Sequence, residues 1–206
     1  MHKIKLILGS KSPRRKELIS KINLPFEVRT KEMEEIYPDS IPSEEVASYL
    51  ANLKAGPLKE TILGDEILLT SDTIVVINDE ILGKPKNKEE AFSMLTKLSN
   101  CTHKVITGVN LFSLEKEVNF STTTEVTFVE LSKDEINYYI DNYSPFDKAG
   151  SYGIQDWIGL IGVKKIEGCY YNVMGLPVNE IYKRLASFQD VKTKNKIKLS
   201  LLIRRL

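Results

Sequence analysis

The chain has 206 residues, of which 42% are hydrophobic and 28% charged, ordinary values for a globular protein with a sizeable core. It holds two cysteines, too few for a disulfide framework, and no apolar run near the ~20 residues that a membrane span needs. We therefore expect a cytoplasmic protein with reduced thiols, not a membrane protein or a disulfide-rich secreted scaffold.

Charge is distributed unevenly along the chain. The net charge is +1, but residues 192–206 carry six basic side chains and no acid, which leaves −5 for the remainder. We expect one domain over residues 1–191, built as two lobes, followed by a basic tail over 192–206. Such a tail can bind nucleic acid, but the acidic remainder shows no pattern of stacking aromatics, so we favour a solvated extension.

The first structural signal is a buried strand that leads into a helix start. The apolar run 4–8 predicts the strand, Ser12 is a suitable N-cap and Pro13 fits the first helical position. Arg14 and Arg15 follow, so guanidinium groups and free backbone N–H groups would face the same space. That combination suits a phosphate chain. The alternative is an ordinary helix start with two solvated arginines.

Strand and helix patterns alternate along the rest of the chain. In order, we predict a strand at 26–29, an acidic loop, a helix from Ser43 through Lys54, and β-rich runs at 67–69 and 74–77. Next come a helix over 88–98 capped by Asn87, a hairpin of 105–114 and 118–129, and a helix from a Ser132 capping box to Asn142. A loop at 147–155, a strand at 158–166, a turn-rich stretch at 168–177 and a helix at 178–188 complete the pattern. This mixture predicts an α/β (mixed α+β) fold.

Asp72 is the first candidate for chemistry, because it interrupts an apolar segment between Ser71 and Thr73. An unpaired buried acid is costly, so its carboxylate should face a cleft, a metal ion or a partner. It could act as a general base for water or as a ligand of a hard cation. Glu34, in the acidic loop, could supply a second oxygen ligand. The alternatives are an aspartate in a turn at a strand end and a solvated loop glutamate.

Two lysines and a glutamine complete the candidates. Lys84 lies between Gly83 and Pro85 in a rigid turn, where it could hold a phosphate or simply face water. Lys54 lies on the apolar side of its helix, so its ammonium group must reach a polar site or extend to solvent. Gln155 closes a glycine-punctuated loop, and its amide offers the donor and acceptor that suit a base edge.

Several familiar sites are absent from the sequence. There is no P-loop or dinucleotide fingerprint, and His103 is the single histidine besides His2, so a histidine metal site or a catalytic triad has little support. What remains is many cations with a few acids, the composition expected where Mg²⁺ and a polyphosphate bind together.

These segments, in this order, resemble the Maf family, also called septum formation inhibitor proteins. The resemblance runs from Leu6 to about Leu185. It rests on Ser10-Lys11-Ser12-Pro13-Arg14-Arg15, Leu53-Lys54-Ala55, Ser71-Asp72-Thr73, Gly83-Lys84-Pro85, Leu98-Ser99 with His103, Thr107 and Gly108, Asp147-Lys148-Ala149-Gly150, and Asn172-Val173-Met174-Gly175-Leu176-Pro177. It implies a fold similar to the inosine-triphosphate pyrophosphatases, with an elongated mixed sheet and a nucleotide cleft between two lobes.

The stretch Gly150–Gln155 resembles the branch of the family that acts on dTTP and UTP. The resemblance implies that Asp72 is the proton acceptor and metal ligand, with Glu34 as a further ligand of Mg²⁺ or Mn²⁺. It implies substrate-binding roles for Ser10, Arg14, Arg15, Lys54, Thr73, Lys84 and Gln155. The chain departs from the usual pattern at Asp156-Trp157, where glycine usually follows the glutamine, and this places a charge and a large ring beside the specificity loop.

We therefore predict an enzyme that hydrolyses nucleoside triphosphates, dTTP and UTP foremost, to the monophosphate and pyrophosphate. A second hypothesis is a nucleotide-binding regulator of septum formation that does not cleave its ligand. A third is nucleic-acid binding through the basic tail. We expect no membrane partner, and the oligomeric state stays open, a homodimer included.

Overall fold

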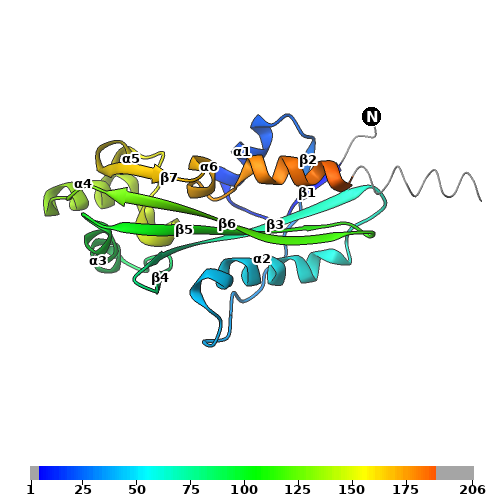
Figure 1. The fold of residues 1–206 in the computed structure, drawn as a ribbon, viewed down its shortest axis with the longest axis horizontal. Helices are drawn as coiled ribbons and strands as arrows, with labels where there is room; N and C mark the ends of the chain where they lie inside the picture. The colour runs from blue at the N-terminus through cyan, green and yellow to red at the C-terminus, as the bar shows by residue number, and fades with distance from the viewer. Residues whose placement is uncertain (1–4, 189–206) are drawn as a thin grey trace, which may run out of the picture.

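The computed structural model describes residues 5–188, and within them one mixed sheet of seven strands forms the centre of the molecule (Figure 1). The strands are β1 (Lys5–Leu8), β2 (Phe26–Val28), β3 (Glu66–Ile77), β4 (Glu80–Leu82), β5 (Thr102–Phe112), β6 (Glu117–Phe128) and β7 (Val163–Glu167). Their order is β2-β1-β3-β5-β6-β7, with β4 also paired to β3. The β1 pairings are parallel and the others antiparallel. The expected mixed α/β class is confirmed.

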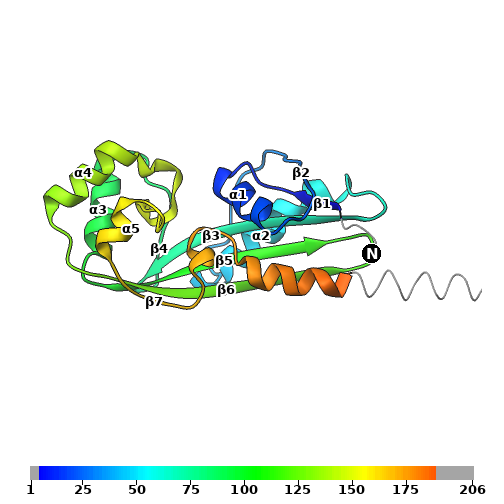
Figure 2. The ribbon, with the colours of Figure 1, turned by 90° about the horizontal axis from the view of Figure 1, so that it is seen from above.

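Helices cover the sheet at both of its ends. They are α1 (Pro13–Lys21), α2 (Ser43–Lys59), α3 (Lys88–Leu98), α4 (Lys133–Tyr143), η1 (Pro145–Asp147), η2 (Ala149–Ser151), α5 (Trp157–Gly162) and α6 (Tyr170–Val173), and residues 178–188 are helical too. Figure 2 shows α3, α4 and α5 gathered at one end of the sheet, and α1 with β1 and β2 toward the other. The long strands β3, β5 and β6 run through both groups, so the two groups of helices share one sheet.

The helix starts that the sequence predicts are present. Ser12 caps α1 by accepting a hydrogen bond from a backbone N–H, and Asn87 caps α3 in the same way. Ser132 and Glu135 form the full capping box at the start of α4. Each cap satisfies an N–H group that has no partner inside its helix.

One expectation about a strand was wrong. Residues 158–166 are not one strand, because residues 157–162 form α5 and β7 begins only at Val163. Gly159 lies so close to the Ile154 carbonyl that a Cβ atom there would be 1.9 Å from its oxygen, and this tight turn accompanies the helix. In addition, the two β-rich runs around Asp72 form one continuous strand, β3, in which Asp72 is buried. The turn-rich stretch 168–177 also contains the short helix α6.

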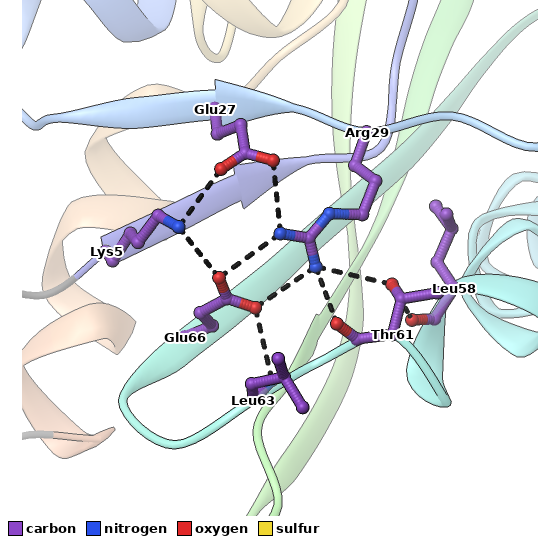
Figure 3. Close-up of polar contacts among 7 residues, drawn as sticks. All are labelled: Lys5, Glu27, Arg29, Leu58, Thr61, Leu63 and Glu66. Atoms are coloured by element: carbon purple, nitrogen blue, oxygen red, sulfur yellow. Dashed lines mark hydrogen bonds and ion pairs between the residues drawn. The ribbon is translucent and has the colours of Figure 1, made fainter.

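An ion-pair cluster fixes the starts of β1, β2 and β3 relative to one another (Figure 3). Glu66 of β3 accepts hydrogen bonds from Lys5 of β1 and from Arg29, and Glu27 of β2 contacts the same two cations. These bonds, those from Arg29 foremost, lower the pKa of Glu66 to about 2. Arg29 also binds the Thr61 carbonyl oxygen at 2.6 Å, so the cluster anchors the loop that starts after β2.

The predicted domain boundary at residue 191 and the basic tail 192–206 lie outside the described residues. None of the helices in the described part of the chain is long and apolar enough to cross a bilayer.

Candidate active site

The candidate site opens at a gap in the strand pairing of β3. Strand β1 pairs with β3 as far as Leu69, and β4 pairs with it from Val75 onward, so residues 70–74 lie between these two partners. A cavity of about 660 Å³ opens beside this stretch. Its charged lining residues come from α1, α2, β3, η1 and four connecting segments: Lys11, Arg14, Arg15, Lys31, Glu32, Glu35, Lys54, Asp72, Lys84, Asp147 and Lys148.

Asp72 and Lys54 form an ion pair at the centre of this gap. Lys54 extends from α2 and hydrogen-bonds Oδ1 of Asp72, and its Nζ atom also lies 2.9 Å from Oε1 of Glu35. Helix α2 can approach because Gly108 of β5, the register partner of Asp72, has no side chain: a Cβ atom there would lie 2.1 Å from the Ala47 carbonyl oxygen. Burial alone would raise the pKa of Glu35, but the bond from Lys54 holds it below its usual value.

Arg15 connects three segments around the gap. Its guanidinium group donates to the carbonyl oxygens of Ser71 (2.8 Å) and Gly175 (2.9 Å) and to the hydroxyl of Thr73 (3.0 Å). A longer bond of 3.4 Å reaches the Ser10 hydroxyl. These contacts engage four of the five guanidinium donors, and one of them satisfies a carbonyl at the open edge of β3. Arg15 therefore holds the residues on either side of Asp72, Ser71 through its backbone and Thr73 through its hydroxyl.

Arg14 faces the opposite wall of the cavity. Its Nη1 atom lies 2.7 Å from Oδ2 of Asp147 in η1, which also accepts a bond from Lys148. Burial raises the pKa of Asp147, but the bonds from Lys148 and Arg14 outweigh that effect and hold the pKa low. An incoming phosphate would compete with Asp147 for Arg14. Lys84, an exposed residue after β4, adds another cation to the lining.

The chain is similar in sequence to a known protein family. The chain matches the family described as Maf-like protein over residues 5–188. It belongs to that family. It is 51% identical over 189 residues to a protein named dTTP/UTP pyrophosphatase from Parabacteroides distasonis, covering 91% of this chain and 98% of that protein. A protein of the same name from Flavobacterium psychrophilum is 53% identical over 178 residues, covering 86% of this chain and 91% of the relative.

Among solved structures, this Maf-like protein matches a nucleoside-triphosphatase, described as a dITP/XTP pyrophosphatase, from Mycobacterium abscessus. The TM-score is 0.42 and the sequence identity 12%, over 92% of this chain and 96% of that one. This match is too weak to support an argument, so the fold class is taken from the sheet and helices of the chain itself.

The Maf-like chain brings nearly all predicted site residues to one cavity. Its lining includes these eight: Ser10, Arg14, Arg15, Lys54, Asp72, Thr73, Lys84 and Gln155. Glu34 is exposed and does not belong to the lining, whereas its neighbour Glu35 does. Asp147 and Lys148 also line the cavity, although the sequence predicted no role for them. Their only signal was their place in a family motif, and nothing local distinguishes Glu35 from Glu34.

The oxygen donors of the site suit a hard divalent cation. The carboxylates of Asp72 and Glu35 converge on the ammonium group of Lys54, so two anionic oxygens already share one cation. Mg²⁺ is commonly held by one or two carboxylates together with substrate phosphates. No group of three or more His, Cys, Asp or Glu residues converges within residues 5–188, so the protein by itself does not offer a closed metal cage there.

Proposed function

We propose that this protein hydrolyses a nucleoside triphosphate, with dTTP and UTP as the preferred substrates, to the nucleoside monophosphate and pyrophosphate. The observation that carries the proposal is one cavity whose lining includes a buried carboxylate, Asp72, together with Arg14, Lys54 and Lys84. The names of relatives about 50% identical support the same activity. They also favour catalysis over a regulator that only binds nucleotide.

In this proposal, Asp72 accepts a proton from a water molecule as the water oxygen attacks the α-phosphorus. The bond between the α-phosphorus and the bridging oxygen to the β-phosphorus breaks, and pyrophosphate leaves with that electron pair. Arg14 and Lys84 stabilise the negative charge that moves onto the pyrophosphate. Arg15 acts differently, since most of its donors are engaged with backbone and hydroxyl groups, and it holds Asp72 in position.

We place a divalent cation, Mg²⁺ or Mn²⁺, against Asp72 and Glu35. When bound, it offsets the charge of the phosphate oxygens. Glu35 is chosen because it lines the cavity and shares Lys54 with Asp72, while the role of Glu34 stays a prediction from the family resemblance. A cytoplasmic location and a homodimer also stay predictions.

One assay tests the proposal. A panel of nucleoside triphosphates is incubated with the protein, with and without Mg²⁺, and pyrophosphate and nucleoside monophosphate are measured. Pyrophosphate in equal amount to dTMP or UMP, dependent on Mg²⁺, is the expected result. Metal-dependent binding of dTTP or UTP without cleavage would favour the regulator instead.

A further inference from the structure

A buried tyrosine fixes the position of one carboxylate beside the cavity. Tyr139 of α4 is fully buried, and its hydroxyl oxygen accepts the backbone N–H of Gly153 at 3.0 Å. The same hydroxyl donates its proton to Oδ2 of Asp156 at 2.8 Å. Because an ionised carboxylate only accepts hydrogen bonds, the direction of this bond is unambiguous. The Tyr139 hydroxyl therefore holds the Asp156 carboxylate in place.

Asp156 in turn fixes the orientation of the Gln155 side chain. The Nε2 atom of Gln155 lies 3.2 Å from Oδ1 of Asp156. An amide oxygen cannot occupy that position, since neither it nor the carboxylate has a proton to share. Lys148 also contacts this carboxylate, with its Nζ atom 3.7 Å from Oδ2.

Gly153 makes this arrangement possible. A Cβ atom at that position would lie 2.5 Å from Oδ2 of Asp156 and 2.8 Å from Nε2 of Gln155. A side chain at this position would push the carboxylate or the amide out of its present place. The groups that hold the Gln155 amide thus lie next to the Gly150–Gln155 stretch, at Asp156, and on α4, at Tyr139.

We propose that Asp156, directed by Tyr139, is a specificity-determining positioning residue. It fixes which way Gln155 presents its amide, and so favours a pyrimidine with an N–H at ring position 3 over one with a bare nitrogen there. Gln155 is the one neutral carboxamide among the described residues that line the cavity. This inference rests on the proposed function and deepens it.

The physical reason is the symmetry of a carboxamide. A free amide can turn over and offer either donor and acceptor order, so it pairs with a uracil-type or a cytosine-type edge equally well. An amide whose nitrogen is held by Asp156 offers one order only. The mismatched base then leaves polar groups unpaired, which costs binding free energy.

The test compares kcat/KM for UTP and CTP, and the dissociation constants of UMP and CMP by calorimetry, in four proteins. These are the wild type, Asp156→Asn, Asp156→Gly and the control Asp141→Asn. The control makes the same chemical change in an exposed ion pair of α4 with Lys88. Circular dichroism verifies that each variant is folded.

In Asp156→Asn, the new amide oxygen takes the Tyr139 proton, so its NH₂ group faces Gln155 and turns that amide over. We expect the UTP to CTP preference to fall by roughly tenfold or to reverse, the scale of one mispaired hydrogen bond. In Asp156→Gly the Gln155 amide is released, and the preference falls without reversing. Asp141→Asn keeps the wild-type ratio. If Asp156→Asn fails to fold, Asp156→Gly decides the question.

An unchanged ratio in a folded Asp156→Gly or Asp156→Asn protein overturns the inference and leaves the proposed function intact. A wild type that releases no pyrophosphate from any nucleotide overturns the proposed function instead. In that case the UMP to CMP ratio of dissociation constants decides: a shift in the Asp156 variants supports the role of Asp156, and constancy overturns it.

Discussion

Lys54 of α2 hydrogen-bonds the carboxylate of Asp72, the residue buried halfway along β3. This contact explains how an acid is tolerated within an apolar strand: the charge is paired, and the pair faces a cavity. The same lysine also contacts Glu35, so two carboxylates and one cation form the centre of the site.

Replacing Asp72 with Asn removes the proton acceptor while keeping the size of the side chain. We expect kcat to fall by about two orders of magnitude or more, the usual contribution of a general base. Pyrophosphate release at saturating nucleotide measures the change, with thermal unfolding as the control for folding. Wild-type turnover in this variant would remove Asp72 from the mechanism.

Glu35→Gln and Glu34→Gln form a matched pair that locates the second carboxylate of the metal site. Because Glu35 lines the cavity and Glu34 does not, Glu35→Gln should raise the Mg²⁺ concentration needed for half-maximal activity by roughly tenfold, and Glu34→Gln by much less. Titration of activity with Mg²⁺ after treatment with a chelator measures both. The opposite order would return the ligand role to Glu34.

Adjacent arginines should respond differently to truncation. Arg15→Ala leaves the carbonyl oxygens of Ser71 and Gly175 without their donor, so we expect the free energy of unfolding to fall by about 3 kcal/mol. Arg14 makes a partly exposed ion pair with Asp147, so Arg14→Ala should cost under ~1 kcal/mol and mainly raise KM.

Urea unfolding and steady-state kinetics on the two variants separate these effects. Equal losses of stability in the two variants would show that Arg15 does not hold the backbone of the site in position.

His103 should make stability depend on pH. Burial lowers its pKa to about 4, and its Nε2 atom lies 2.8 Å from the Tyr152 hydroxyl. Between pH 6.5 and 4 the unfolded chain binds a proton that the folded protein does not, so stability is full above pH 6.5 and declines as pH falls. The loss should reach about 2 kcal/mol by pH 5.

His103→Gln removes this titration and keeps a hydrogen-bonding group near Tyr152. Denaturant unfolding at pH 7 and pH 5 should show a smaller difference in the variant than in the wild type. The ion-pair cluster of Glu66 adds little to this difference, because its contribution is lost only as pH falls from the ordinary pKa of 4.5 toward about 2, below the pH range compared.

Local signals in the sequence predicted local structure well. The caps at Ser12, Asn87 and Ser132 are formed by neighbouring side chains and backbone groups, so a few residues suffice to identify them. The strand predicted at 158–166 was wrong because a short apolar run is compatible with a buried helical turn as well as with a strand. The helical turn is accompanied by close packing of Gly159 on the Ile154 carbonyl, a tertiary contact that hydrophobic periodicity does not reveal.

The site was predictable where chemistry and family pattern coincide. Asp72 was predicted because an acid within an apolar run needs a partner. Lys54 was predicted because the ammonium group of a lysine on an apolar helix face must reach a polar site or solvent. Their direct pairing depends on how α2 crosses the sheet over Gly108, which no local pattern contains. Glu35 was missed for a similar reason: the direction of a side chain in a loop is set by distant contacts.

The last residues of β1 and of β4, Leu8 and Leu82, also set the length of the opening along β3. Five residues of strand span about 16 Å, so the aperture along β3 is as long as that backbone segment. Adding even one residue to either flanking strand would narrow it by about 3 Å. The length of this opening is thus determined by the hydrogen-bond register of β1 and β4 on β3.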